Sequence, residues 1–203
     1  MPADAKVEQF PVLVRLHRDF FDFAQAKPDG EDLRFSLSSG ARMAFQIEEW
    51  DAANGVSSVW VRVPLISGNT RQEITLHWGN ANATSESDGQ AVFNESNGCL
   101  SVWHMSDPVR DDIGTLTCTD TGTTAAEGVI GAARHFADLK GVFCGDMIPN
   151  YPTGASSHST EVWFRPERPN STLIAWGNEL VITHIFPCAP YPNGVLPQSL
   201  GSP

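Results

Sequence analysis

Aromatic side chains are the clearest candidates for chemistry in this sequence. Six tryptophans occur among 203 residues, and an indole ring can stack on the C–H face of a sugar ring. Alternation places Trp60 and Trp163 on the polar faces of their expected strands, beside Arg62 and Glu161. We therefore take Trp60, Trp103 and Trp163 as candidate ligand-binding residues for a carbohydrate or small molecule. The alternative is core packing, because Trp is highly buried on average.

Three aspartates fall in a loop that is expected to follow a strand, namely Asp107, Asp111 and Asp112. Carboxylate oxygens are preferred ligands of Ca²⁺, so these residues are the candidate metal ligands and calcium is the candidate cofactor. Their spacing differs from that of an EF-hand loop, and the alternative is that they are solvated surface carboxylates.

The six histidines show no HExxH spacing and no GxSxG elbow is present. His104 together with Asp111 or Glu161 would form an acid–base pair if the second half folded around a cleft. These three are the candidate catalytic residues of a small hydrolase. The alternative is that His104 is a packed strand residue.

The charge of the chain excludes some partners. The net charge is -11, and the 13 Lys and Arg residues are scattered singly, whereas nucleic acids and anionic membranes select clustered basic residues. No stretch approaches the ~18 apolar residues of a membrane helix, so we expect no membrane insertion. The start of the chain shows no apolar signal-peptide core, so the chain as written is expected in the cytoplasm.

The four cysteines, Cys99, Cys118, Cys144 and Cys188, match no zinc ribbon and no CxxC motif. Isolated cysteines are usually buried or free thiols, and we expect that here. One disulfide within the second half is the alternative.

Period-two alternation dominates the first ninety residues and predicts short antiparallel strands separated by turns. The fold class is therefore all-β, an antiparallel, jelly-roll-like β-sandwich, and a short stretch from Asp19 to Ala26 is the helical candidate there. The alternating apolar residues predict this core: Val12, Val14, Leu33, Phe35, Val59, Val61 and Leu76.

Composition divides the chain into three parts. Residues 1–93 form a β-sandwich module, residues 94–179 a second, partial sandwich, and residues 180–203 an uncharged Pro-rich tail that begins with an apolar run able to supply a strand. Residues 114–131 are rich in Gly, Thr and Ala and are expected to be irregular. Strands of the second part are expected at 100–105, 134–136, 142–143, 160–165 and 173–176.

Five ordered blocks resemble a bacterial domain of unknown function, number 2341, over about residues 8–93. They are Phe10–Leu16, Gly30–Phe35, Phe45–Trp50, Val59–Pro64 and Ile74–Asn80. The resemblance implies a β-sandwich module of large envelope proteins and brings no activity with it. The parent protein is then expected in the cell envelope or outside the cell.

A second resemblance covers Ser101–Met105, Gly131–Phe136 and Ser159–Pro166, which look like the opening of a concanavalin A-like (laminin-G-like) jelly roll. That fold needs more residues than remain, so the second domain is truncated. Unpaired edges are usually covered by another chain. We therefore predict a homodimer through residues 160–186, or a second half that merges with the first module.

Three functions remain open. The preferred one is a non-catalytic module that binds carbohydrate or a cell-surface polymer. The alternatives are a hydrolase of an ester, lactone or glycoside, with or without calcium, and a structural spacer domain.

Overall fold

The computed structural model describes residues 2–114, 116–137, 139–145, 150–153, 156–167, 171–176 and 180–184. The chain divides into two compact units, Met1–Tyr151 and Pro152–Pro203. Antiparallel strands dominate the described residues, and the helices among them are short: η1 (Phe23–Gln25), α1 (Gly89–Val92) and η2 (Glu95–Asn97). The predicted all-β, sandwich-like fold class is confirmed, and η1 lies within the helical candidate.

One layer of the first unit is a sheet of three long strands: β1 (Lys6–His17), β4 (Phe45–Asp51) and β5 (Val56–Ser67). The order is β1-β5-β4, and both pairs are antiparallel. Val61 lies opposite both Val12 and Phe45. Because directly paired residues share a face, Val12, Val61 and Phe45 point the same way.

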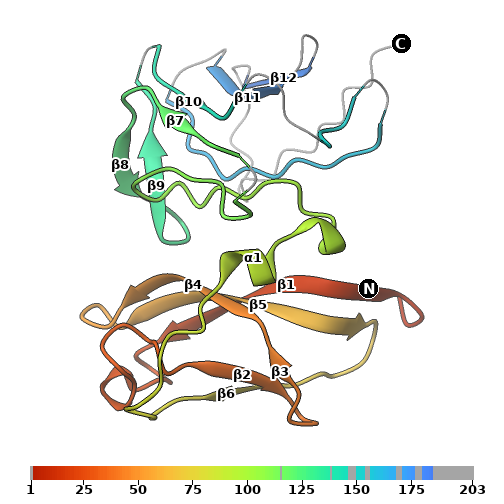
Figure 1. Cartoon of the computed structure of the whole chain (residues 1–203), viewed down its shortest axis with the longest axis vertical. Helices are drawn as coiled ribbons and strands as arrows, with labels where there is room; N and C mark the ends of the chain where they lie inside the picture. Colours follow the sequence, from red (N-terminus) through yellow and green to blue (C-terminus); the bar gives the residue numbers. More distant parts are fainter. Residues whose placement is uncertain are drawn as a thin grey trace. The chain divides into compact units, whose positions relative to one another are not determined.

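The other layer consists of shorter strands: β2 (Arg34–Leu37), β3 (Arg42–Met43) and β6 (Ile74–His77), in the order β3-β2-β6. Phe35 pairs with Met43 on one side and with Leu76 on the other. These three residues face the apolar side of the first sheet, and Figure 1 shows the two sheets as facing layers.

The predicted core is confirmed. Val59 and Val61 are 0% exposed, and Leu33 and Phe35 are buried beside them. Val12, Val14 and Leu76 are partly buried and pack against the same cluster. Alternation alone identified these residues, because each strand buries one face.

A second apolar cluster covers the outer side of the β1-β5-β4 sheet. Val92, Phe93 and Ile113 are its buried members, and Trp60 and Val102 pack against them. Figure 1 shows α1 on this side of the sheet. The chain after residue 93 therefore continues to pack on the first module, and residue 93 as a domain boundary stays a prediction.

The rest of the first unit holds two small antiparallel pairs. β7 (Thr119–Asp120) pairs with β10 (Val142–Phe143), and β8 (Thr124–Glu127) pairs with β9 (Ala132–His135). The strands expected at 134–136 and 142–143 are thus found. The prediction of an irregular 114–131 segment was wrong for β7 and β8, because their small, largely exposed residues show no alternation.

The strand expected at 100–105 is not formed. The amide of Val102 donates to the Asp111 carboxylate, and its carbonyl accepts from the amide of Asp112. Met105 has a φ of 56°, which ends an extended run. These backbone groups are therefore used by a loop contact in place of a strand ladder.

Cys118 and Cys144 form a disulfide, so the expectation of free or buried thiols was wrong for these two. In the β7–β10 pair Thr119 lies opposite Phe143, which brings the preceding and following cysteines together. Cys99 is a free thiol, and burial raises its pKa. Cys188 lies outside the described residues.

In the second unit β11 (Ser171–Trp176) pairs with β12 (Leu180–His184). The strand expected at 173–176 and the strand supplied by the start of the tail are therefore present. The strand expected at 160–165 is not: this segment has no ladder partner among the described residues, and Val162, Trp163 and Phe164 are exposed. The homodimer through residues 160–186 stays a prediction, and residues 185–203 lie outside the described residues.

None of the helices in the described part of the chain is long and apolar enough to cross a membrane.

Candidate functional site

The outer face of the β3-β2-β6 sheet is polar. Arg34 lies opposite His77, and Ser36 lies opposite both Arg42 and Thr75. Since Phe35 and Leu76 turn inward, strand alternation turns these five polar residues outward. The sheet therefore presents a hydrogen-bonding surface on this side.

The loop that follows β6, residues 79–88, runs beside this polar face and is tied down along its length. Nη2 of Arg34 donates to the carbonyl of Thr84 at 2.6 Å, and Nζ of Lys27 donates to the carbonyl of Ala83 at 2.9 Å. At its far end the hydroxyl of Ser87 accepts from the amide of Ile47 at 2.8 Å. The loop is thus held by two cationic side chains and one backbone amide from three separate segments of the chain.

The turn into this loop depends on Gly79 and Asp32. Gly79 has a φ of +93°, a left-handed conformation that favours glycine. Its amide donates to Oδ2 of Asp32 at 2.6 Å, while Oδ1 of Asp32 accepts from the amide of Lys27 at 2.9 Å. Asp32 is a buried carboxylate whose two oxygens both accept backbone hydrogen bonds.

Trp78 is the aromatic residue of this region. Its ring packs on Phe21, with 5.2 Å between the ring centroids, yet 41% of the residue stays exposed. Phe21 in turn packs on Phe23 and Trp50 within the core. The indole is therefore supported by the core and open to solvent at the same time.

A groove of about 430 Å³ lies between the sheet face and the loop, which is within the range of small-molecule sites. Its lining combines the exposed indole with polar groups, among them Arg42, His77, Asn80, Asn82 and Glu86. The groove therefore combines one exposed aromatic ring with several hydrogen-bonding groups.

Glu86 forms ion pairs with both arginines of the groove. Its Oε1 lies 3.1 Å from Nε of Arg34, and its Oε2 lies 2.7 Å from Nη2 of Arg42. Nη1 of Arg34 donates to the carbonyls of Glu31 and Leu33. Arg34 thus contacts both the loop and the segment before β2, whereas Arg42 is exposed.

A serine–histidine hydrogen bond lies next to the groove. Oγ of Ser36 is 2.9 Å from Nε2 of His77, which is within the distance range of a nucleophile and its base. Ser36 is only 7% exposed, while His77 lines the groove. The pair therefore fixes the His77 ring and offers little of the hydroxyl to solvent.

The three tryptophans singled out from the sequence have other surroundings. Trp60 packs on Phe93 and His104, and its Nε1 donates to Glu48. Nε1 of Trp103 lies 3.3 Å from the sulfur of Cys118. Trp163 is 68% exposed in the second unit. Ligand binding by these residues stays a prediction.

His104 lies in a buried polar cluster on the outer side of the β1-β5-β4 sheet. Its Nδ1 is 3.2 Å from Oε2 of Glu48 and its Nε2 is 3.7 Å from Oδ2 of Asp112, and the three side chains are at most 10% exposed. Nε2 also lies 3.1 Å from Oε1 of Gln46. The cluster therefore connects residues 104–112 to β4. Glu161, which was a candidate partner of His104, lies in the second unit.

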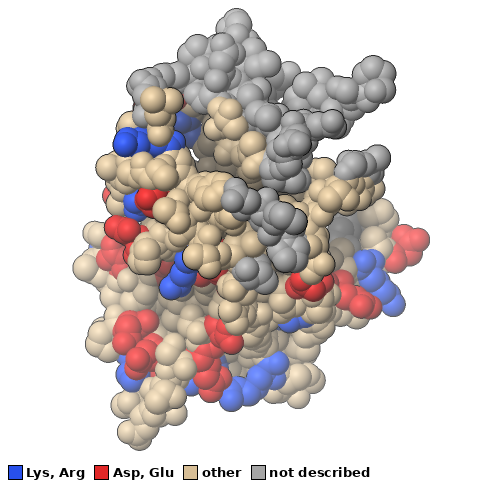
Figure 2. Space-filling view, turned by 45° about the horizontal axis from the view of Figure 1, so that its top comes forward, with Lys and Arg blue, Asp and Glu red and all other residues tan. Residues whose placement is uncertain are grey.

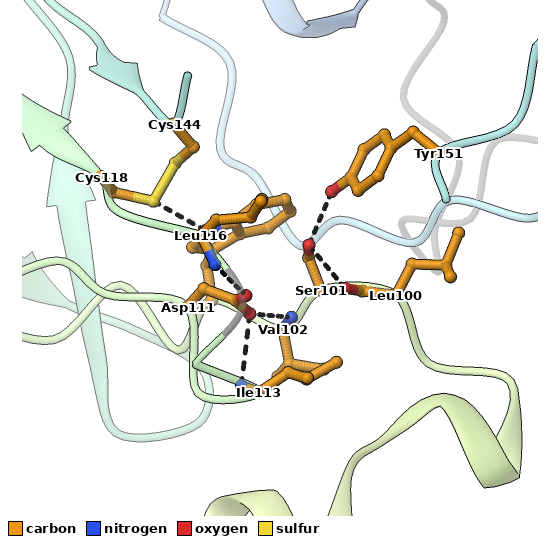
Figure 3. Close-up of a disulfide and its surroundings, with 10 residues drawn as sticks. Leu100, Ser101, Val102, Asp111, Ile113, Leu116, Cys118, Cys144 and Tyr151 are labelled. Atoms are coloured by element: carbon orange, nitrogen blue, oxygen red, sulfur yellow. Dashed lines mark hydrogen bonds between the residues drawn. A yellow bond between two sulfur atoms is a disulfide. The ribbon is translucent and has the colours of Figure 1, made fainter. Parts of the chain in front are cut away.

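The aspartates predicted to bind calcium have partners within the chain. Asp111 accepts from the amides of Val102, Ile113 and Leu116, as Figure 3 shows. Asp112 pairs with Arg110 at 3.0 Å, and Asp107 lies 3.4 Å from Arg134. The described residues contain no group of three His, Cys, Asp or Glu side chains arranged to hold a metal ion. Calcium binding stays a prediction.

Sequence reasoning missed the groove. Trp78 was not selected because it follows Ile74 and Leu76 in the alternation and so indicated core packing. β6 ends at His77, however, and Trp78 already belongs to the turn. A tryptophan directly before Gly79 and Asn80, in a stretch rich in polar residues, was the signal available.

Comparison with known families gives one match. The model of the Domain of unknown function (DUF2341) matches residues 29–101. This range includes β2 to β6 and the lining of the groove. The resemblance to this domain is confirmed there, whereas the concanavalin A-like resemblance stays a prediction. No curated protein and no solved structure matches the chain.

Proposed function

We propose that this chain is a non-catalytic module that binds carbohydrate or a cell-surface polymer, and that the groove beside Trp78 is its binding site. The observation that carries the proposal is the partly exposed Trp78 ring on a groove whose other lining is mainly polar. The Trp78 groove takes the place of Trp60, Trp103 and Trp163 as the first site to test.

Sugar binding needs two kinds of contact, and the groove supplies both. The C–H face of a pyranose packs on an aromatic ring, and its hydroxyls exchange hydrogen bonds with amides, carboxylates and guanidinium groups. Trp78 offers the ring. Asn80, Asn82, Arg42 and Glu86 offer donors and acceptors within the same groove.

The groove is also fixed before a ligand arrives. The bonds from Arg34, Lys27 and Asp32 hold the loop at three points. The hydrogen bond with Glu31 raises the pKa of Lys27 against the opposing effect of desolvation. A loop that is already ordered loses less conformational entropy when a ligand binds. This favours the binding of weak polar ligands such as glycans.

The disulfide supports an envelope or extracellular location for the parent protein. Disulfides persist in oxidising compartments and are rare in the cytosol of mesophiles. The Cys118–Cys144 bond therefore fits the location that the family resemblance implies.

The test is a glycan array followed by calorimetry on the wild type and four variants. Trp78→Ala should abolish binding, because it removes the stacking platform. Phe20→Ala is the matched control: Phe20 is an exposed aromatic residue outside the groove lining, and this variant should bind as the wild type does. Trp163→Ala decides whether the second unit contributes.

Trp78 also packs on Phe21, so Trp78→Ala changes core packing as well as the groove. Asn82→Ala removes a polar lining group without touching the core, and it should weaken binding with an unchanged melting temperature. Full binding by both variants would reject the groove. A chain that binds no glycan at all would leave the structural spacer and the hydrolase as the remaining functions.

A hydrolase is the second candidate, and the Ser36–His77 pair is the observation in its favour. A panel of chromogenic esters tests it with Ser36→Ala as the inactive control. Turnover no faster than in buffer, or turnover unchanged by Ser36→Ala, removes this candidate.

A further inference from the structure

We infer that the groove selects uncharged glycans and discriminates against acidic ones. This rests on the proposed function and deepens it, because it names the ligand class of the same site. The balance of charge inside the groove and the charge of the whole chain carry the inference.

The charged side chains that line the groove cancel. Arg34 and Arg42 are the cations, and Asp32 and Glu86 are the anions. Glu86 faces both arginines, one through each of its oxygens. A carboxylate held between two guanidinium groups occupies the positions that a ligand carboxylate would need.

Arg34 and Asp32 have few hydrogen-bonding atoms left for a ligand. Nη1 and Nη2 of Arg34 are used on backbone carbonyls, and its Nε faces Glu86. Asp32 accepts from two backbone amides. Only Arg42 and Glu86 combine a place in the lining with large exposure, and they are paired with each other. An incoming anion would therefore meet Arg42 only in competition with, and beside, the carboxylate of Glu86.

Apart from the Arg42–Glu86 ion pair, whose charges cancel, the groove offers a ligand the Trp78 ring and the neutral amides of Asn80 and Asn82. Amides of this kind both donate to and accept from sugar hydroxyls. They carry no formal positive charge that would pair with a carboxylate or sulfate on the sugar.

The net charge of the whole chain also disfavours acidic glycans. A net charge of -11 repels polyanions at a distance and does not affect a neutral polymer. Figure 2 shows acidic and basic side chains interspersed on the face that it presents, without a large basic area to attract a polyanion. Uncharged glycans are therefore the class that the site favours.

The experiment compares three probes on the full chain: neutral β-glucan and xylan oligosaccharides, a polygalacturonate oligosaccharide, and a sulfated glycan. We expect the neutral class to bind at least about tenfold more tightly than either acidic class at low salt. We also expect its affinity to change less than about twofold as salt rises from roughly 0.05 M to 0.5 M.

Glu86→Gln supplies the internal test. It frees Arg34 and Arg42 from their carboxylate and should raise the affinity for polygalacturonate about tenfold, in a salt-dependent manner. Glu73→Gln is the matched control, because Glu73 pairs with Arg71 outside the groove lining and should leave selectivity unchanged.

The outcomes separate the two proposals. Tighter binding of an acidic glycan by the wild type, lost in Trp78→Ala, overturns the inference and keeps the proposed function. Unchanged selectivity in Glu86→Gln overturns the role given to Glu86. Binding of neither class overturns the proposed function and the inference with it.

Discussion

Buried polar side chains shape this protein at the scale of single residues. Asp32, Asp111 and Asp112 are each less than a tenth exposed, and each has hydrogen-bond or ion-pair partners that replace water. Losing the partner of such a group costs about 1–3 kcal/mol, whereas the paired group adds only a little stability. The main effect of these residues is therefore to determine which loops contact each other. Their contribution to the free energy of unfolding is small.

The apolar core gives the first prediction at this scale. Val61→Asp should unfold the first module, because an unpaired carboxylate between the sheets costs several kcal/mol, on the order of the whole stability of a small domain. Thr75→Asp is the control, since Thr75 is exposed on the outer face of the other sheet. Far-UV circular dichroism with urea titration measures both. A folded Val61→Asp protein would contradict the sandwich register.

Asp120 gives a pH-dependent prediction. The backbone amide of Thr123, followed by the Thr123 hydroxyl, lowers the pKa of Asp120 below its ordinary value of 3.8, and the Gly122 amide and Arg134 act in the same direction. A lowered folded-state pKa stabilises above the unfolded pKa, and this stabilisation is lost as the pH falls through the folded-state pKa.

Asp120→Asn should therefore lower the melting temperature at neutral pH and should reduce the drop in stability seen on acidification below about pH 4. Thermal melts at several pH values measure this. Asp4→Asn, a change near the start of the chain, controls for net charge alone. Parallel pH profiles of wild type and Asp120→Asn would contradict the assignment.

At the scale of elements, short strand pairs make up most of the regular structure after residue 93. β7 and β10 are two residues each, and the disulfide beside them joins positions 26 residues apart. Nε1 of Trp103 contacts Cys118, so the disulfide also borders the segment that covers the β1-β5-β4 sheet. A strand pair this short has few hydrogen bonds to offset the entropy lost when the long loop between its strands is closed. The disulfide provides the additional link.

The paired change Cys118→Ser with Cys144→Ser should lower stability by roughly 3 kcal/mol, from the loop that the bond closes. Wild-type protein in reducing agent should melt like the double variant, and Cys99→Ser should melt like the oxidised wild type. Thermal melts give the stability, and mass spectrometry of alkylated peptides gives the bond. Free Cys118 in the oxidised protein would reject the assignment.

At the scale of the whole molecule, the first unit has more layers than a two-sheet sandwich. The core cluster lies between the sheets, and the second cluster lies between β5 and the chain after β6. The His104 cluster and a bond from Asn97 to the carbonyl of Gln9 fix this outer cover. The family match ends at residue 101, within the cover.

Truncation tests whether the cover belongs to the module. A fragment of residues 1–93 should melt at a lower temperature than residues 1–151 and should bind a hydrophobic dye, because Trp60 and Phe93 lose their contacts with His104 and Ile113. Thermal melts and dye fluorescence measure this. Equal melting temperatures would show that residue 93 is a true domain boundary.

The sequence by itself determined which residues of the first module face the core. Strand side chains alternate with a period of two, so Val59, Val61 and Phe35 could be assigned inward from local pattern alone. The polar outer face of β2 and β6 follows from the same rule. The candidate site was different, because its parts come together only when distant segments pair.

Glu48 meets His104 across 56 residues, Cys118 meets Cys144 across 26, and Arg34 reaches Glu86 across 52. No local pattern encodes such distances, since they depend on strand order, on the register and on where a loop is tied. Whether Trp78 packs or stays exposed was likewise decided by the end of β6 at His77. Tertiary structure therefore decided the groove, the disulfide and the outer cover, and local alternation decided the core.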